Sequence, residues 1–445
     1  MADSISQTNA PKTVTYLKRG SGAVGTKAAD LSGTVAAMLA ELELGREPVA
    51  LRLSRQLDRW EGDIAISDDA IAAASARVPQ GLKDDIAYAH ENIARFAQAQ
   101  RASLRETEVE LRPGLLVGQR LIPVGSAGCY VPGGRYSHIA SAMMTVTTAK
   151  VAGVAHIAAV SPPRIGTPAG IPDAILYTLK LCGADRILAL GGIQGVAALA
   201  FGMFGLPPAD ILVGPGNQYV AEAKRLLYGR IGIDMVAGPT DSMVIADKTA
   251  DPMVVAWDLI GQAEHGLNSP VWLVTDCPVL AAEVARLAPF CAAELPQPNR
   301  AAAEGAWATL AEIILCDGRE AMAAHADRVA PEHLHVQAAD LEWWKSRLCA
   351  YGSLFLGAES AVAFGDKAAG TNHVLPTSGA ARYTGGLSVH KFLKTVTWQQ
   401  ISAQALPRLA AVTASISRFE GMEGHARTAD IRLEKFTNGA TLPQP

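Results

Sequence analysis

The sequence predicts an α/β fold with two Rossmann-like parallel-sheet modules, each incomplete, preceded by a helical region and followed by a small helical segment. From about residue 115 onward, short apolar runs alternate with helical stretches, which is typical of βα units with parallel strands. Several of the apolar runs end in glycine-rich turns. The 445 residues are enough for two or more such domains.

The composition narrows the class of protein. Hydrophobic residues make up 49%, charged residues 18%, and the formal charge is -4, which suits a globular enzyme without a basic nucleic-acid surface. No apolar run approaches the roughly 20 residues of a membrane span, and no basic region followed by an apolar one marks a secretory signal. The six cysteines are scattered, so we expect free thiols and a cytoplasmic protein.

The elements follow in order along the chain. Residues 30 to 108 have a helical pattern in an alanine-, glutamate- and arginine-rich background. Strands are then predicted at residues 157–160, 186–190, 211–213, 243–246, 271–275 and 313–315, with helices at 171–181, 196–203, 219–228 and from 252 onward. We therefore divide the chain into a helical region (1–115) that packs on the second module, a first module (116–240), a second module (241–380) and a C-terminal helical segment (381–445).

Two glycine-rich turns are candidates for a nucleotide site. Residues 191–195 and 214–217 each follow a predicted strand and precede a helix. Ligands of open α/β sheets bind at such strand ends, and helix N-termini suit phosphates. Neither turn is a GxGxxG fingerprint, and tight packing turns explain them equally well. The run at residues 130–134 has the same two interpretations.

One predicted helix ends in side chains that suit a cation. Asp251 is a good N-cap, Pro252 fits the first helical position, and Gly266 suits the residue after the end. The spacing places Gln262 and His265 on one face of the last turn, where the helix carries partial negative charge. Glutamine is an uncommon metal ligand, so a capped surface helix remains the alternative.

Further polar residues are scattered over the second half of the chain. Glu332 and His333 are adjacent, which favours two separate roles because neighbouring side chains seldom aim at one atom. Asp366 and His373 lie in a long glycine- and proline-rich stretch, and loops of that length are usually functional. His425 lies near the end of the C-terminal segment. Such residues suit zinc, so the residues predict an α/β enzyme with a divalent metal and a nucleotide.

Six motifs, in this order, resemble the histidinol dehydrogenase family. They are Gly214-Pro215-Gly216-Asn217, Ala237-Gly238-Pro239-Thr240, Gln262-Ala263-Glu264-His265, Pro331-Glu332-His333, Gly370-Thr371-Asn372-His373-Val374-Leu375-Pro376-Thr377, and Glu420-Gly421 with His425. The resemblance covers roughly residues 30 to 435 and is strongest to the sulfopropanediol dehydrogenases within that family.

The resemblance implies a role for each matched residue. It implies one zinc ion per active site, bound by Gln262, His265, Asp366 and His425, with NAD contacted by Tyr130, Gln194 and Asn217. His425 would come from the other subunit of a homodimer with shared active sites, through an exchanged segment 381–445. Glu332 and His333 match the acid/base pair, and the substrate would contact Thr240, His373, Glu420 and Asn268. The first module would hold NAD and the second the zinc helix.

The resemblance also implies the reaction, while departures from the family pattern bear on the substrate. Family members oxidise a primary alcohol through the aldehyde to the carboxylate with two NAD, in which His333 removes a hydroxyl proton and Glu332 activates water. Val362 stands where the histidinol enzymes have a glutamate, and His390 and Lys391 stand where they have acidic residues. His138 and Asn268 add donors nearby.

Because a buried carboxylate would repel a sulfonate, these departures predict an anionic diol, (R)-2,3-dihydroxypropane-1-sulfonate, oxidised to (R)-3-sulfolactate. The alternative substrate is L-histidinol, oxidised to L-histidine, with His390 and Lys391 merely facing solvent. Two other classes of function stay open: a catalytically silent zinc-binding homologue and a scaffolding protein. Competent residues at every inferred catalytic position favour the dehydrogenase.

Overall fold

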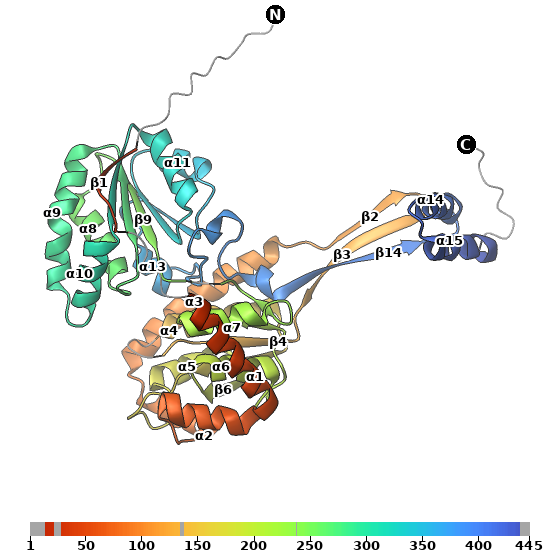
Figure 1. The fold of residues 1–445 in the computed structure, drawn as a ribbon, viewed down its shortest axis with the longest axis horizontal. Helices are drawn as coiled ribbons and strands as arrows, with labels where there is room; N and C mark the ends of the chain where they lie inside the picture. The colour runs from red at the N-terminus through yellow and green to blue at the C-terminus, as the bar shows by residue number, and fades with distance from the viewer. Residues whose placement is uncertain (1–13, 22–27, 134–137, 237, 437–445) are drawn as a thin grey trace, which may run out of the picture. The chain divides into compact units, whose positions relative to one another are not determined.

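The structure is a computed structural model that describes residues 14–21, 28–133, 138–236 and 238–436 (Figure 1). The chain divides into a large unit, residues 1–101 and 124–392, and a small unit, residues 102–123 and 393–445. The large unit contains two parallel sheets, which confirms the predicted α/β class. The division at residues 115, 240 and 380 stays a prediction. Within the described residues, no helix is long and apolar enough to cross a membrane.

The first sheet of the large unit is wholly parallel. Its strands are β4 (Ser126–Tyr130), β5 (His156–Ser161), β6 (Arg186–Ala189), β7 (Ile211–Val213) and β8 (Gly232–Ile233), in the order β6-β5-β4-β7-β8. Its helices are α4 (Ile139–Ala152), α5 (Asp173–Cys182), α6 (Gly192–Phe201) and α7 (Gln218–Leu227). The strand order reverses between β4 and β7, and ligands of such sheets bind at that point, beyond the strands' carboxyl ends.

The second sheet repeats this strand order. It comprises β9 (Ser242–Ala246), β10 (Val271–Thr275), β11 (Glu312–Cys316), β12 (His333–Gln337) and β13 (Ser353–Leu356), with the antiparallel β1 (Val14–Lys18) at its edge; the order is β1-β11-β10-β9-β12-β13. Figure 1 shows α8 (Pro252–Ala263), α9 (Pro278–Glu294) and α10 (Asn299–Thr309) on one face and α11 (Arg319–Val329) on the other. Apolar side chains of the strands alternate between the two cores that these helices form.

The N-terminal region is mostly helical. Its helices are α1 (Ala28–Leu53), the short π-helical turn η1 (Ser54–Asp58), α2 (Asp68–Arg77) and α3 (Gln80–Ser103). Apolar residues of α1 share one core with α6 and α7, and α2 packs on α5. The expectation that this region packs on the second module is therefore wrong for α1 and α2. The strand β1 of this region joins the second sheet.

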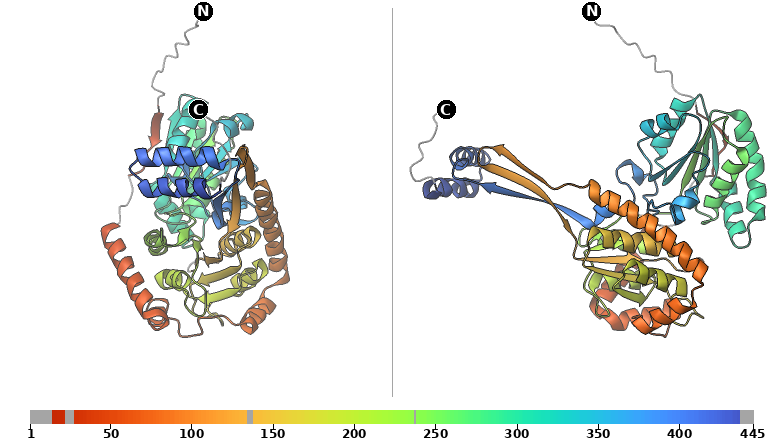
Figure 2. Two further views of the ribbon diagram at one scale, coloured as in Figure 1. Left: turned by 90° about the vertical axis from the view of Figure 1, so that its right-hand side faces the viewer. Right: turned by 180° about the vertical axis from the view of Figure 1, so that it is seen from behind.

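The small unit consists of a three-stranded antiparallel sheet and two helices. Figure 2 shows β2 (Thr107–Arg112), β3 (Leu115–Pro123) and β14 (Leu393–Ile401) running side by side, followed by α14 (Leu406–Phe419) and α15 (Glu423–Phe436). The two helices confirm the small helical C-terminal segment. None of the three strands was predicted: β2 alternates polar and apolar residues, but its beginning was assigned to the helical N-terminal region and β14 to the helical C-terminal segment.

Candidate active site

The candidate residues of the second module lie at the amino edge of its sheet. His333 begins β12 and pairs with Ser242, the first residue of β9. Helix α8 leaves the carboxyl end of β9 and returns to the start of β10, so its last turn, with Gln262, comes back to the same edge. Strand and helix ends therefore bring together residues that are about 70 to 100 positions apart in the sequence.

A reciprocal pair of hydrogen bonds holds Glu332 in place. Its carboxylate oxygen Oε2 accepts from the backbone N–H of Asp241 at 3.1 Å, and its own backbone N–H donates to Asp241 Oδ1 at 2.6 Å. The other oxygen of Asp241 accepts from the backbone N–H of Ser378 at 3.1 Å. Glu332 and Asp241 are both buried, so this network fixes the position of the Glu332 carboxylate.

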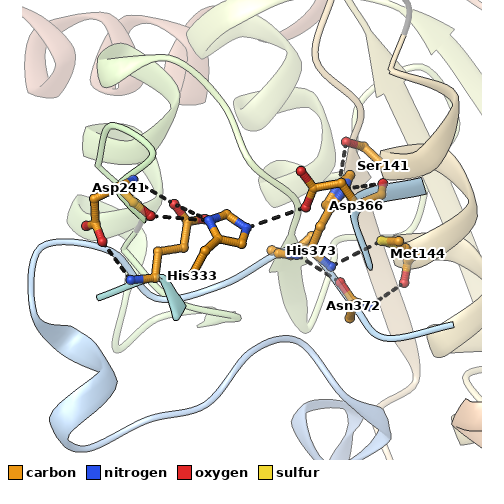
Figure 3. Close-up of polar contacts among 9 residues, drawn as sticks. Ser141, Met144, Asp241, His333, Asp366, Asn372 and His373 are labelled. Atoms are coloured by element: carbon orange, nitrogen blue, oxygen red, sulfur yellow. Dashed lines mark hydrogen bonds and ion pairs between the residues drawn. The ribbon is translucent and has the colours of Figure 1, made fainter. Parts of the chain in front are cut away.

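The imidazole of His333 is oriented between a carbonyl and a carboxylate (Figure 3). Its Nδ1 lies 3.2 Å from the backbone carbonyl oxygen of Asp241. Because a carbonyl only accepts, Nδ1 carries the hydrogen, and Nε2 of the neutral ring is the basic nitrogen. Nε2 lies 3.4 Å from Asp366 Oδ1 and makes no hydrogen bond. The ring thus presents a free basic nitrogen beside the Asp366 carboxylate.

Burial and neighbouring charges shift the pKa values of these groups. Burial raises the pKa of Glu332, and the Asp241 carboxylate adds to the rise while His333 opposes it. Burial lowers the pKa of His333, but the Glu332 and Asp366 carboxylates outweigh it and raise the pKa overall. Burial raises the pKa of Asp366, yet the His333 imidazole prevails and brings it down to about 2. Two groups with raised pKa values and one ionised carboxylate thus share a buried site.

His373 joins this site to helix α4 of the first module. Its Nδ1 lies 3.0 Å from the backbone carbonyl oxygen of Asp366, and its Nε2 lies 2.9 Å from the Ser141 hydroxyl. The neighbouring Asn372 donates its side-chain N–H to the carbonyl oxygen of Met144 at 3.0 Å. Figure 3 shows these contacts on the far side of Asp366 from His333. The long loop predicted to be functional therefore connects the two modules.

The remaining groups suit a metal ion. Gln262 is buried, and its oxygen Oε1 has no hydrogen-bond partner. A cation at this position would supply the missing partner. His265 lies near enough to Asp366 for that charge to act on its imidazole and lines a cavity of about 430 Å³ together with Gly133, His138, Gly266, Leu267, Pro298, Ala301 and Ala302. Amide, imidazole and carboxylate are donors that zinc accepts.

Zinc prefers four ligands, and the described residues bring only part of that set together. Among them, no three histidine, cysteine, aspartate or glutamate side chains converge as a metal site. His265 follows α8 rather than lying within its last turn, because the helix ends at Ala263. The predicted Asp251 cap is confirmed, since its carboxylate accepts from two backbone N–H groups of α8.

The three residues matched to NAD lie at the carboxyl edge of the first sheet. Tyr130 ends β4 and its hydroxyl accepts from the Gly192 N–H at 3.0 Å. Gln194 lies in the first turn of α6, and Asn217 caps α7 by accepting from two backbone N–H groups. Gly214 has φ +114°, and a Cβ there would lie 2.1 Å from the carbonyl oxygen of Tyr130, so the turn needs glycine for close approach of the two strands.

The other predicted residues are dispersed. Thr240 is half-buried directly before Asp241, and Asn268 is exposed in the turn after α8. Glu420 ends α14 and His425 lies on α15, both exposed in the small unit, so their grouping with the other site residues stays a prediction. Some calls fall partly outside the described residues: Gly134 of the turn at 130–134 and Ala237 of its motif.

Three residues of the site were missed by the sequence analysis: Asp241, Ser141 and Asp58, which accepts from Gln194 Nε2 at 2.8 Å. Asp241 offered a signal, because a carboxylate directly before an apolar strand must find buried partners. Ser141 and Asp58 offered none, since their partners are 232 and 136 residues away.

Comparison with known proteins places the chain among related sequences. A family model described as histidinol dehydrogenase matches residues 24–433. A histidinol dehydrogenase homolog of Ruegeria pomeroyi is 66% identical, over 95% of this chain and 98% of the relative. A sulfopropanediol 3-dehydrogenase of the same organism is 60% identical, over 95% and 97%. The crystal structure of histidinol dehydrogenase from Elizabethkingia anophelis matches with a TM-score of 0.86 at 32% identity, over 92% and 94%.

Proposed function

Because the chain belongs to the histidinol dehydrogenase family of oxidoreductases, we propose that it is a zinc- and NAD-dependent dehydrogenase that oxidises a primary alcohol through the aldehyde to the carboxylate. The observation that carries this proposal is the buried row of Asp366, His333, Glu332 and Asp241 beside the unpartnered amide oxygen of Gln262. These groups fit a metal site with an acid/base pair.

The bound groups and the side chains have separate tasks. Zinc, held by Gln262, His265, Asp366 and the partner subunit's His425, would fix and polarise the substrate oxygens, and NAD would accept a hydride in each of two steps. His333 takes the hydroxyl proton in the first step, since its Nε2 is the basic nitrogen. Thr240 and His373 would contact the substrate.

Glu332 acts in the second step. Its pKa, raised by burial, suits a group that takes a proton from the water that adds to the aldehyde. Asp241 keeps the Glu332 carboxylate at one position through the two reciprocal hydrogen bonds. Two adjacent residues thereby serve two successive proton transfers.

The proposed substrate is (R)-2,3-dihydroxypropane-1-sulfonate, oxidised at C3 to (R)-3-sulfolactate. The 60% identity to a sulfopropanediol 3-dehydrogenase supports it, as does buried Val362 at the position of an acidic residue in the histidinol enzymes. Burial, and after it the nearby groups of His373, Lys367, His265 and Arg164, lower the pKa of His138 to about 4. The positive charges of Lys367 and Arg164 act on His138, which lines the cavity, and positive charge favours an anion.

Other features bear on this choice of substrate. His138 lines the cavity, whereas His390 and Lys391 belong to a short 3₁₀ turn, η3 (Val389–Phe392), and Lys391 donates to Thr384 at 2.9 Å. The anion preference therefore depends on His138 and its neighbours more than on the pair at 390 and 391. L-Histidinol remains the second candidate, because Glu420 offers a carboxylate for its ammonium group.

We also propose that two copies of the chain share their active sites. The small unit exposes several large apolar side chains on and beside its helices: Ile416, Phe419, Met422, Ile431 and Phe436. Large apolar side chains exposed on one small unit suit an interaction surface, and a second copy is the occupant that would also bring the partner subunit's His425 and Glu420 to the zinc site. Within the part of one chain that the structure describes, no three histidine, cysteine, aspartate or glutamate side chains converge, so a ligand from a second copy would help to complete the set.

The test of the reaction is its stoichiometry with the zinc-loaded enzyme. NADH released and alcohol consumed are measured to completion, with the aldehyde trapped and quantified in parallel. We expect two NADH per alcohol and no free aldehyde. One NADH per alcohol with accumulating aldehyde would refute the two-step mechanism. No NADH from a panel of primary alcohols, sulfonated and cationic ones included, would favour the catalytically silent homologue.

A further inference from the structure

The side-chain amide of Gln194 is held at one end and free at the other. Gln194 is 1% exposed in the first turn of α6. Its nitrogen Nε2 donates to Asp58 Oδ2 at 2.8 Å, while its oxygen Oε1 is buried without any hydrogen-bond partner. A buried unpartnered carbonyl oxygen costs about 1–3 kcal/mol, so this atom indicates a ligand that donates to it.

Asp58 determines which end of the amide is free. An ionised carboxylate only accepts hydrogen bonds, so the amide must turn its NH₂ group toward Asp58 and its oxygen away. Without Asp58, rotation of the amide by half a turn would exchange acceptor and donor at little cost. The carboxylate therefore sets the hydrogen-bonding character of the ligand site.

The same contacts argue against a phosphate at this turn. The Gly191 N–H points to Asp58 Oδ2 at 3.4 Å, and the Gly192 N–H donates to the Tyr130 hydroxyl at 3.0 Å. In a phosphate-binding turn these N–H groups would face the anion. Here a carboxylate occupies that place and a carbonyl oxygen lies beside it, and both would repel a phosphate.

The backbone explains how Asp58 reaches the turn. Asp58 ends η1, and the next residue, Arg59, has the left-handed φ of 53° that terminates it. The N–H of Trp60 then closes back on the Ser54 carbonyl oxygen at 3.3 Å. Burial raises the pKa of Asp58, while the donors on Gln194 and Gly191 oppose the rise. A segment outside the first sheet thus completes the edge where ligands bind.

We propose that Asp58 is a positioning residue for the dinucleotide: it orients Gln194 so that Oε1 accepts a hydrogen bond from a hydroxyl or amide N–H of NAD, and the phosphates bind away from the 191–192 turn. This inference rests on the proposed NAD-dependent function. It assigns Asp58 no contact with NAD of its own. The effect of Asp58 must therefore pass through Gln194.

A double-mutant cycle on NADH binding tests this dependence. NADH affinity is measured by fluorescence titration for wild type, Asp58→Ala, Gln194→Met and the double variant. We expect each single variant to weaken binding roughly threefold to tenfold, the size of one net hydrogen bond, and the double variant to be no weaker than Gln194→Met alone. Asp58→Asn, which keeps an oxygen acceptor, is expected within about threefold of wild type.

One control variant and two possible results separate the outcomes. Asp63→Asn removes the same charge at an exposed neighbouring position and should leave NADH binding unchanged. If wild type itself fails to bind NADH, the proposed function is refuted. If wild type binds but the two single effects add in the double variant, Asp58 acts independently of Gln194 and the inference is wrong.

Should Asp58→Ala not fold, a structure of the wild-type NADH complex decides instead. The expected result is a hydroxyl or amide nitrogen of NAD within hydrogen-bond distance of Gln194 Oε1, with the contact between Gln194 and Asp58 intact. A phosphate oxygen on the Gly191 or Gly192 N–H would overturn the inference.

Discussion

Replacing Asp241 should damage the second oxidation more than the first. In the wild type, the backbone N–H groups of Glu332 and Ser378 donate to the Asp241 carboxylate at 2.6 and 3.1 Å. The Asp241→Ala substitution removes both acceptors. At about 1–3 kcal/mol for each unsatisfied buried group, the free energy of unfolding should fall by about 2–6 kcal/mol. The Glu332 carboxylate keeps the Asp241 N–H as a donor but loses the anchor of its own backbone.

The catalytic loss should be smaller than removal of a general base, which costs about 10²–10⁴-fold. We expect kcat for aldehyde oxidation to fall roughly tenfold to a hundredfold, or about 1.4–2.8 kcal/mol, and alcohol oxidation to fall much less. Both rates are measured from NADH formation, starting from either the alcohol or the aldehyde, below the melting temperature of each variant. Asp241→Asn keeps one acceptor and should restore much of the rate.

The control for Asp241 lies at the other end of the same strand. Asp247 also accepts from two backbone N–H groups, those of Thr249 and Ala339, each at 2.8 Å, but at the carboxyl edge of the sheet. Asp247→Ala should lower stability without separating the two oxidation rates. If Asp241→Ala slows both oxidations by one common factor, as Asp247→Ala would, then Asp241 has only a structural role and the reasoning fails.

Three further predictions concern chemistry, assembly and stability. Glu332→Gln should slow aldehyde oxidation more than alcohol oxidation, by roughly 10²–10⁴-fold; equal slowing in stopped-flow traces would contradict its late role. His265→Ala and His425→Ala should each lose zinc and activity, and mixed subunits should regain some of both; no recovery in proven heterodimers would place the site within one chain. The pKa of His325 is lowered to about 4, first by burial and then by the charge of Arg328. The Arg328 guanidinium donates to His325 Nδ1 at 2.7 Å. The unfolded state therefore binds the extra proton as pH falls from about 6.5 toward about 4, so melting temperatures should drop over that range, and less so in His325→Gln.

Much of the fold could be predicted because local pattern determines it. Alternating apolar runs and helices identified three strands of each sheet, for example β7 and β10, since parallel strands are buried on both faces. The strand β12 was missed because its residues 333–337 include two buried histidines. A search for runs of apolar residues does not recognise histidine as a core residue. The three strands of the small unit were missed because the residues up to 108 and from 381 onward were assigned to helical segments, although β2 alternates polar and apolar residues.

Residue spacing predicted less of the candidate site than the resemblance to a known family did. Gln262, His265, Asp366 and Glu332 come from different elements, and spacing gave no reason to group them. The rule that ligands bind at carboxyl ends of strands applies to the first sheet but not to His333, which lies at the amino edge of the second. The hydrogen bond between Asp58 and Gln194 forms only because segments more than a hundred residues apart pack together. A single sequence does not reveal such packing.

The measurement that tests the central proposal most directly is the ratio of kcat/KM for two substrates. The zinc-loaded enzyme is assayed with NAD and either (R)-2,3-dihydroxypropane-1-sulfonate or L-histidinol under identical conditions. An unpaired buried charge costs several kcal/mol, so a site suited to an anion should prefer the sulfonate by about 10²-fold or more. Activity with L-histidinol within about tenfold of the sulfonate would contradict the assignment and favour histidinol as the substrate.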